Sequence, residues 1–139
     1  MGLVYADIEL ISSFDLEASK RGFIKAEEVK KVKVNALVDS GAYMLAINET
    51  IKGQLDLQTV DEQLAELANG HVEKVEIVGP VDVRFDNRST TCRAVVLPGD
   101  TQVLLGAIPM EDMDVIIDPR NRQLTVPPER PYLAKKSLK

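Results

Sequence analysis

The tripeptide Asp39-Ser40-Gly41 places a reactive group in an unusual position. It follows the largely apolar run 34–38 and precedes Ala42. A carboxylate at the end of a core-facing strand is costly unless it is paired, caps a turn or takes part in chemistry. We interpret Asp39 as a carboxylate that takes part in chemistry, and the remaining residues decide which chemistry that is.

Two other kinds of reactive site do not fit the residues present. Ser40 lies in no G-x-S-x-G elbow, and His71 is the only histidine that could serve as its base. One histidine, one cysteine and scattered carboxylates have no metal-ligand spacing, so no metal and no cofactor are expected. For His71 itself, an ordinary exposed loop position is the simplest reading.

Composition restricts the class of protein and its partners. The 139 residues, 45% of them hydrophobic, predict one compact domain. A net charge of -5 and a pI near 4.9 argue against nucleic acid as a partner. No stretch is long and apolar enough to cross a membrane, and the single Cys92 allows no intrachain disulfide. We therefore expect a soluble, cytoplasmic protein that binds neither nucleic acid nor membrane.

The elements that must position Asp39 are mainly short strands separated by turn residues, which predicts an all-β fold. A polar loop is expected over 12–28, and the Gly79-Pro80 pair predicts a bulge within one long strand. The predicted strands cover 3–11, 32–38, 75–85, 90–97, 103–105, 115–117 and 123–126, and short helices are expected at 48–55 and 109–113.

The segment Thr59 to Ala68 has two readings. Its helix-forming residues and apolar spacing favour a helix, with Asn69-Gly70 as the C-cap. Alternatively, Asn69-Gly70 is the two-residue turn of a β-hairpin that continues into 72–78. Local sequence leaves both readings open.

The run 36–42 resembles the active-site turn of the retropepsin-like aspartic proteases, in which apolar residues precede Asp, Thr or Ser, Gly and a small residue. Val103-Leu104-Leu105-Gly106 resembles the apolar pair and glycine that pack behind this turn in the family. The segments 108–113 and 115–119 resemble the family's C-terminal helix and the strand after it. The resemblance extends from about Val29 to Val126.

This resemblance implies a closed, acid-protease-like β-barrel with one or two short helices and one retropepsin-like lobe per chain. The domain would cover residues 1–126, followed by a C-terminal tail over 127–139. The family has a flap hairpin after the active-site turn, so the resemblance implies that 59–68 is a strand and that the two-residue turn Asn69-Gly70 forms the tip of the flap.

The resemblance also assigns roles to individual residues. The catalytic group would be Asp39, Ser40 and Gly41, and structural support would come from Leu105 and Gly106. The substrate-binding residues would be Ala42, Tyr43, Asn69, Gly70 and His71. Viral enzymes have acidic positions after the small residue and an Arg after the later glycine; here Tyr43, Met44 and Ala107 replace them. Bacterial and archaeal relatives are therefore the better match.

The implied mechanism needs two carboxylates, and the chain contains one such motif. Asp114 and Asp118 lack the Ser/Thr-Gly continuation. The resemblance therefore implies a homodimeric endopeptidase in which two Asp39 carboxylates, one per subunit, activate a water that hydrolyses a peptide bond. Two alternatives remain open: a protease-fold dimer that binds peptides or scaffolds a partner without cleaving, and a monomeric β-barrel domain without catalysis.

Overall fold

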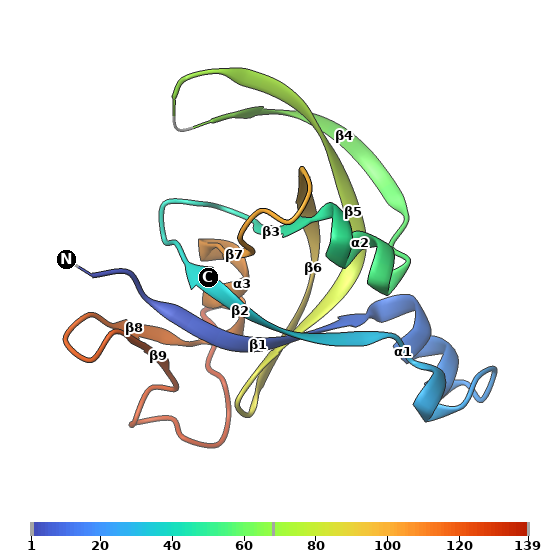
Figure 1. Cartoon of the computed structure of the whole chain (residues 1–139). Coiled ribbons are helices and arrows are strands. Elements are labelled where there is room, and N and C mark those ends of the chain that lie inside the picture. Colours follow the sequence, from blue (N-terminus) through green and yellow to red (C-terminus); the bar gives the residue numbers. More distant parts are fainter. Residues whose placement is uncertain (1, 68, 139) are drawn as a thin grey trace.

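The computed structural model describes residues 2–67 and 69–138, and across these residues it is mostly β-structure with short helices (Figure 1). This confirms the predicted all-β fold class. The strands are β1 (Tyr5–Ser12), β2 (Lys31–Val38), β3 (Leu45–Asn48), β4 (Thr59–Glu66), β5 (Val72–Phe85), β6 (Arg88–Leu97), β7 (Leu104–Leu105), β8 (Ile116–Asp118) and β9 (Gln123–Thr125). The helices are α1 (Ser13–Lys20), the 3₁₀-helix η1 (Ala26–Glu28), α2 (Glu49–Leu55) and α3 (Ala107–Met113).

Strands β1 to β7 form one mixed sheet, in the order β1-β2-β7-β3-β6-β5-β4. Strand β1 pairs with both β2 and β5, so the sheet folds back on itself. The short β7 runs parallel to β2 and antiparallel to β3, and β3 is parallel to β6. Strands β8 and β9 form a separate hairpin. As a result, the ends of β2 and β7 lie next to each other, where Asp39 begins.

The core follows from the alternation of apolar residues along the strands. Ala6, Ile8 and Leu10 of β1 are buried, as period-two alternation predicts for a strand with one face toward the core. Helix α2 contributes two buried apolar side chains, Ile51 and Leu55, and α3 contributes three, Pro109, Met110 and Met113. Each fully buried side chain of this size contributes roughly 1.5–3 kcal/mol. The sheet around Asp39 therefore rests on a continuous apolar core.

The prediction of a loop over 12–28 is wrong, because this segment contains α1 and η1. The Ser12 hydroxyl caps α1 by accepting from the Asp15 N–H at 3.2 Å. The Asp15 carboxylate is buried and accepts from both the backbone N–H and the Nζ of Lys30, at 2.9 and 2.8 Å. Helix α1 lacks an apolar stripe, since Asp15 turns inward while Phe14 is 77% exposed. Among the described residues there are thus three α-helices rather than one or two.

Strands β4 and β5 form a long hairpin, called the flap below, which curves over β3 (Figure 1). The strand reading of Thr59 to Ala68 is confirmed over Thr59–Glu66, and Ala68 lies outside the described residues. Pairing with β5 along the whole of β4 outweighs the local helix propensity. The expected bulge at Gly79-Pro80 is also present, as a register shift between Val78 and Val81.

The tip of the flap differs from the predicted two-residue turn. Leu67 N–H donates to the His71 carbonyl at 2.7 Å, and Gly70 N–H donates to the Leu67 carbonyl at 2.8 Å. Three residues therefore separate the paired Leu67 and His71. Gly70 has φ of 81°, the conformation expected for the last loop residue of such a hairpin. The Asn69 side chain also stabilises the turn, because its Oδ1 accepts from the His71 N–H at 2.9 Å.

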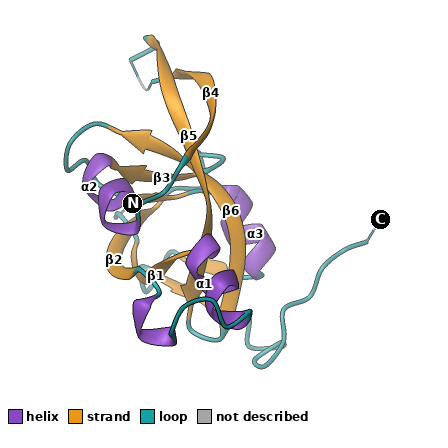
Figure 2. Cartoon of the chain, turned by 90° about the vertical axis from the view of Figure 1, so that its right-hand side faces the viewer, coloured by secondary structure: helices purple, strands orange, loops and turns teal. Residues whose placement is uncertain are grey.

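The segment after β9 leads away from the sheet along the side of β6 and α3 (Figure 2). Arg130 forms a two-pronged ion pair with Asp114 at the end of α3, with distances of 2.7 and 2.9 Å. The Arg130 carbonyl accepts from the buried Arg88 guanidinium at 2.6 Å, and the Pro131 carbonyl accepts from Asn87 at 2.7 Å. These bonds fix the start of the tail against α3 and β6. None of the helices in the described part of the chain is long and apolar enough to span a membrane.

Candidate active site

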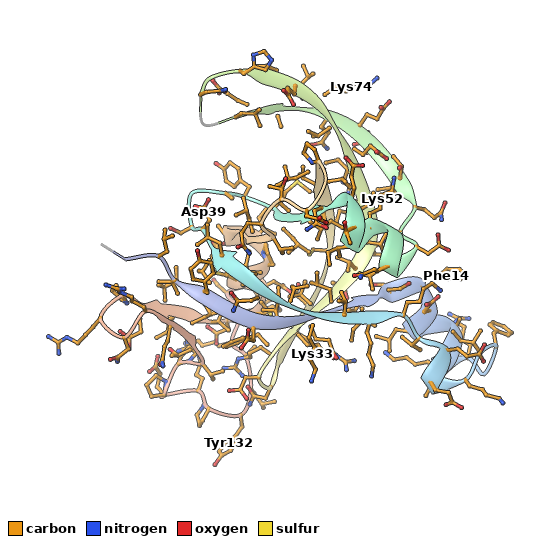
Figure 3. The ribbon with its side chains drawn as sticks, in the orientation of Figure 1. Phe14, Lys33, Asp39, Lys52, Lys74 and Tyr132 are labelled. Carbon is orange, nitrogen blue, oxygen red and sulfur yellow. The ribbon has the colours of Figure 1, made fainter. Side chains whose placement is uncertain are left out.

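The sheet fixes the backbone on both sides of Asp39. Val38 N–H donates to the Val4 carbonyl at 2.8 Å, and Asp39 N–H donates to the Leu105 carbonyl at 3.0 Å. The backbone of Asp39 is therefore held by β7, although β2 ends one residue earlier. Its side chain is half-buried and lies where the regular pairing stops, on the side toward which the flap curves (Figure 3). The position is rigid at the backbone and open at the carboxylate.

A short turn over residues 39–42, called the Asp39 turn below, orients this carboxylate. Asp39 Oδ1 accepts from the Gly41 N–H at 2.9 Å, and the Asp39 carbonyl accepts from the Ala42 N–H at 3.1 Å. A Cβ at Gly41 would lie 3.2 Å from Asp39 Oδ1, so the glycine keeps this approach free. Within the described part of the chain, the Asp39 carboxylate pairs with no other carboxylate.

Gly106 packs directly beneath the Asp39 turn. A Cβ on Gly106 would lie 2.3 Å from the Met44 carbonyl oxygen and 2.8 Å from the Ala42 carbonyl oxygen. Its φ is -88°, so the glycine is needed for space and not for backbone conformation. Because no side chain intervenes, the first turn of α3 reaches the Asp39 turn. Ala107 N–H donates to the Ala42 carbonyl at 2.7 Å, and Ile108 N–H donates to the Tyr43 carbonyl at 2.8 Å.

An apolar groove of about 370 Å³ lies between the Asp39 turn and the flap. Its floor is formed by residues 41–44 with Ala46 and Leu104, and its roof by the flap residues 63–66, Val75 and Ile77. Val95 of β6 joins the two sides, because it pairs with both Ala46 and Ile77. Most of these side chains are small or aliphatic. A cleft of this size between two strand-bearing surfaces can hold several side chains of an extended peptide.

The predicted site residues fall into four groups. Gly41 to Tyr43 line the groove, whereas Asp39 and Ser40 lie beside it in the same turn and are not among the lining residues. The flap tip, residues 69–71, also lies beyond the lining. Leu105 and Gly106 lie behind the Asp39 turn, as described above. The His71 side chain is largely exposed, with its Nε2 3.8 Å from Glu73 Oε1.

The lining residues Gln63, Ala65, Val75 and Val95 were missed by the sequence reasoning. Gln63 pairs with Val75, and Ile77 pairs with Val95, so lining residues on β4, β5 and β6 are brought together by strand pairing. On β4 the lining is continuous over residues 63–66. The sequence could indicate these residues only if 59–66 was first accepted as a strand, and the helix propensity of that segment argued against a strand.

Asp114, Asp118 and Cys92, which could also carry chemistry, have structural roles away from the Asp39 turn. Hydrogen bonds from Arg130 and from the Lys135 N–H hold the pKa of Asp114 well below its usual range. The Asn121 side chain and backbone N–H likewise lower the pKa of Asp118, which organises the β8–β9 turn. Burial raises the pKa of the Cys92 thiol to about 12, which makes it a poor nucleophile. In the described residues, no three His, Cys, Asp or Glu side chains gather as metal ligands.

The sequence profile of the family described as gag-polyprotein putative aspartyl protease matches residues 27–110, more than half of the chain. The chain belongs to this aspartyl protease family. The matched residues run from η1 into α3, so they include the Asp39 turn, the flap and Gly106. Strand β1 and helix α1 precede the match.

Comparison with solved structures agrees with the family. The fold of this chain is similar to the crystal structure of the retroviral protease-like domain of Ddi1 from Leishmania major, with a TM-score of 0.55 and 15% sequence identity. The alignment covers 92% of this chain and 90% of that chain. At this identity the likeness establishes a retropepsin-like fold. A search of curated proteins found no match.

Proposed function

We propose that the chain is one half of an aspartic endopeptidase, completed when a second copy supplies a second Asp39. The observation that carries the proposal is a single oriented carboxylate, half-exposed at the end of β2 beside an apolar groove. Among the described residues it is held by the Gly41 N–H, and no second carboxyl group bonds to it. Aspartic protease chemistry needs a pair of carboxylates. A two-fold axis close to Asp39 generates that pair from one motif.

Exposed apolar side chains around the Asp39 turn support a partner at this end. Leu3, Tyr43 and Ile108 are 63%, 78% and 51% exposed. Leu3 precedes Val4, whose carbonyl binds Val38, and Ile108 donates its N–H to the Tyr43 carbonyl, so all three flank the turn. Several large apolar side chains exposed together are typical of an interface. A second copy centred on Asp39 would cover them.

The chemistry of the proposed pair follows from electrostatics. Two carboxylates at hydrogen-bond distance share one proton and titrate as a unit. The ionised member removes a proton from a water whose oxygen attacks the peptide carbonyl carbon, and the protonated member donates to the carbonyl oxygen. Collapse of this intermediate breaks the C–N bond, and the leaving amine takes up a proton.

Neighbouring residues have supporting roles in this proposal. The Gly41 N–H holds the Asp39 carboxylate, and the exposed Ser40 hydroxyl would bond across the two-fold axis. Ala42 and Tyr43 would contact substrate from the floor, and the flap tip over residues 69–71 would close over it. A cytoplasmic location belongs to the same proposal and is supported by the single cysteine of the sequence, Cys92, which is half-buried as a free thiol.

The decisive comparison is wild type against Asp39→Asn, assayed on an unfolded protein and a peptide pool from mildly acidic to neutral pH. We expect cleavage by the wild type, inhibition by a pepstatin-class compound, and loss of about 10³-fold or more in the variant. Sedimentation should give twice the 15.3 kDa of one chain for both proteins. No turnover by a dimeric wild type would favour the non-catalytic, peptide-binding alternative. In that alternative the hydrogen bond from Gly41 to Asp39 serves only to stabilise the turn. A persistent monomer would contradict both.

A further inference from the structure

The sheet face that looks into the groove, formed by the flap and the neighbouring β6, has an ion pair beyond the groove's apolar part. Asp61 is two residues before Gln63 on β4, and Arg93 is two residues before Val95 on β6, so each shares a face with a groove-lining residue. The Arg93 Nη1 lies 4.0 Å from Asp61 Oδ2, which confirms that both side chains lie on this face. Because β4 runs from the base of the flap toward its tip, the pair lies at the base, beyond Gln63.

The two members of the pair differ in the hydrogen bonds that they already make. Asp61 Oδ2 accepts from the Gln63 side chain at 3.1 Å, and its Oδ1 accepts from the Glu62 N–H at 2.8 Å. These bonds, more than the attraction of Arg93, lower the pKa of Asp61. Arg93 has only the loose 4.0 Å contact, and half of its side chain is exposed. A half-exposed pair of this length contributes little stability, so the guanidinium can be engaged by a better partner.

We propose that Arg93, with Asp61 and Gln63 behind it, forms an outer subsite that selects an acidic side chain in the peptide substrate. The proposal rests on the proposed protease function and extends it to substrate preference. A guanidinium binds a carboxylate through two parallel N–H donors, which is a tighter geometry than its present contact with Asp61. Asp61 attracts the guanidinium toward this face, and Gln63, whose side-chain N–H donates to Asp61, leaves its amide oxygen at the edge of the groove.

The geometry also determines which residue of the substrate would contact Arg93. An extended peptide advances roughly 6.7 Å for every two residues, and this is the same step that separates Gln63 from Asp61 along β4. A peptide whose apolar side chain fills the groove under Gln63 and Val95 therefore presents the residue two positions further toward the flap base to Arg93. In a symmetric dimer the second copy repeats the subsite, so acidic residues are preferred at mirrored positions on both sides of the cleaved bond.

The test uses matched peptides that keep the apolar residues constant and vary this outer residue among Glu, Gln and Lys. For the wild type we expect kcat/KM for Glu to exceed that for Gln by about fivefold, the upper range for exposed ion pairs, with Lys lower still. Arg93→Gln should abolish the difference, and Arg93→Glu should reverse it in favour of Lys. The control is Lys74→Gln, which removes the same charge from the opposite face of the flap, where Lys74 pairs with Glu62; it should leave the preference unchanged.

Binding of the same peptides to the Asp39→Asn variant separates this inference from the proposed function. If cleavage is absent altogether, the dissociation constants of the Glu and Gln peptides still measure the subsite. Equal kcat/KM and equal Kd for the two peptides would overturn the outer subsite while leaving the protease proposal intact. A loss of preference in Lys74→Gln as large as in Arg93→Gln would also overturn it, because the effect would then reflect overall charge.

Discussion

Gly106→Ala is the sharpest test of how the fold supports the Asp39 turn. The new methyl group would lie 2.3 Å from the Met44 carbonyl oxygen and 2.8 Å from that of Ala42. Favourable C···O contacts begin near 3.3 Å, so the overlap with Met44 is about 1 Å and falls on backbone, which cannot swing aside as a side chain does. Either α3 moves away from the turn or the turn itself shifts.

The expected cost has two parts. Overpacking in a close-packed site costs about 1–3 kcal/mol. Displacing α3 also weakens the hydrogen bonds from Ala107 and Ile108 to the turn, each worth about 1 kcal/mol. We therefore expect the free energy of unfolding to fall by about 3 kcal/mol, which in a domain of this size lowers Tm by roughly 10 °C. Any remaining folded protein should show lower kcat, since the carboxylates would be displaced.

The matched control is Gly53→Ala in α2, where a Cβ would meet no atom within 4 Å. Alanine is the better helix former by about 1 kcal/mol, so this variant should be as stable as the wild type or slightly more stable. Urea unfolding monitored by circular dichroism measures both variants. If Gly106→Ala unfolds within about 0.5 kcal/mol of the wild type and keeps its activity, the packing argument for Gly106 is wrong.

Two further predictions concern groups outside the site. Asp114 has a lowered pKa in the folded state, so its ion pair with Arg130 stabilises the fold above the ordinary pKa of an aspartate, about 3.9, and this contribution is lost as the pH falls toward the folded value. Asp114→Asn should therefore be less stable than the wild type at neutral pH, and the difference should shrink below about pH 4; a constant difference across that range would contradict the role of the ion pair. Burial raises the pKa of the Cys92 thiol to about 12, so a maleimide should label it slowly in the native protein and quickly in urea, and Cys92→Ala should keep its activity. Equal labelling rates in both conditions would contradict the burial.

The parts of the fold predicted correctly are those where local pattern and tertiary structure agree. Strand β2 alternates its apolar residues, and Asn48 caps α2 with its side chain, as each segment's sequence indicates. Gly79-Pro80 interrupts β5 with the expected bulge. In each case the pattern involves only residues that are close in the sequence, so it can be recognised without knowing which distant segments pack against it.

The parts that failed depend on distant partners. Helix α1 has its capping signal in Ser12, but its inward residue is Asp15, which is buried only because Lys30 lies beside it. The groove lining depends on the pairing of β4 with β5 and on the position of both strands over β3. A short stretch of sequence contains no information on either. For the same reason the Arg93–Asp61 pair could not be predicted, since its members are 32 positions apart in the sequence.

Helix α3 connects the Asp39 turn to the C-terminal tail, and both bear on how a second copy could bind. Its first turn binds the Asp39 turn through Ala107, and its last residue is followed by Asp114, which holds Arg130 and with it the tail. The tail is thereby fixed on the β6 side of α3, through Arg88 as well. A partner that meets Asp39 would consequently meet Leu3, Tyr43 and Ile108, with tail residues 135–137 beside Ile108. We therefore expect Tyr43→Ser to weaken the proposed dimer, whereas truncation after β9 should destabilise each subunit.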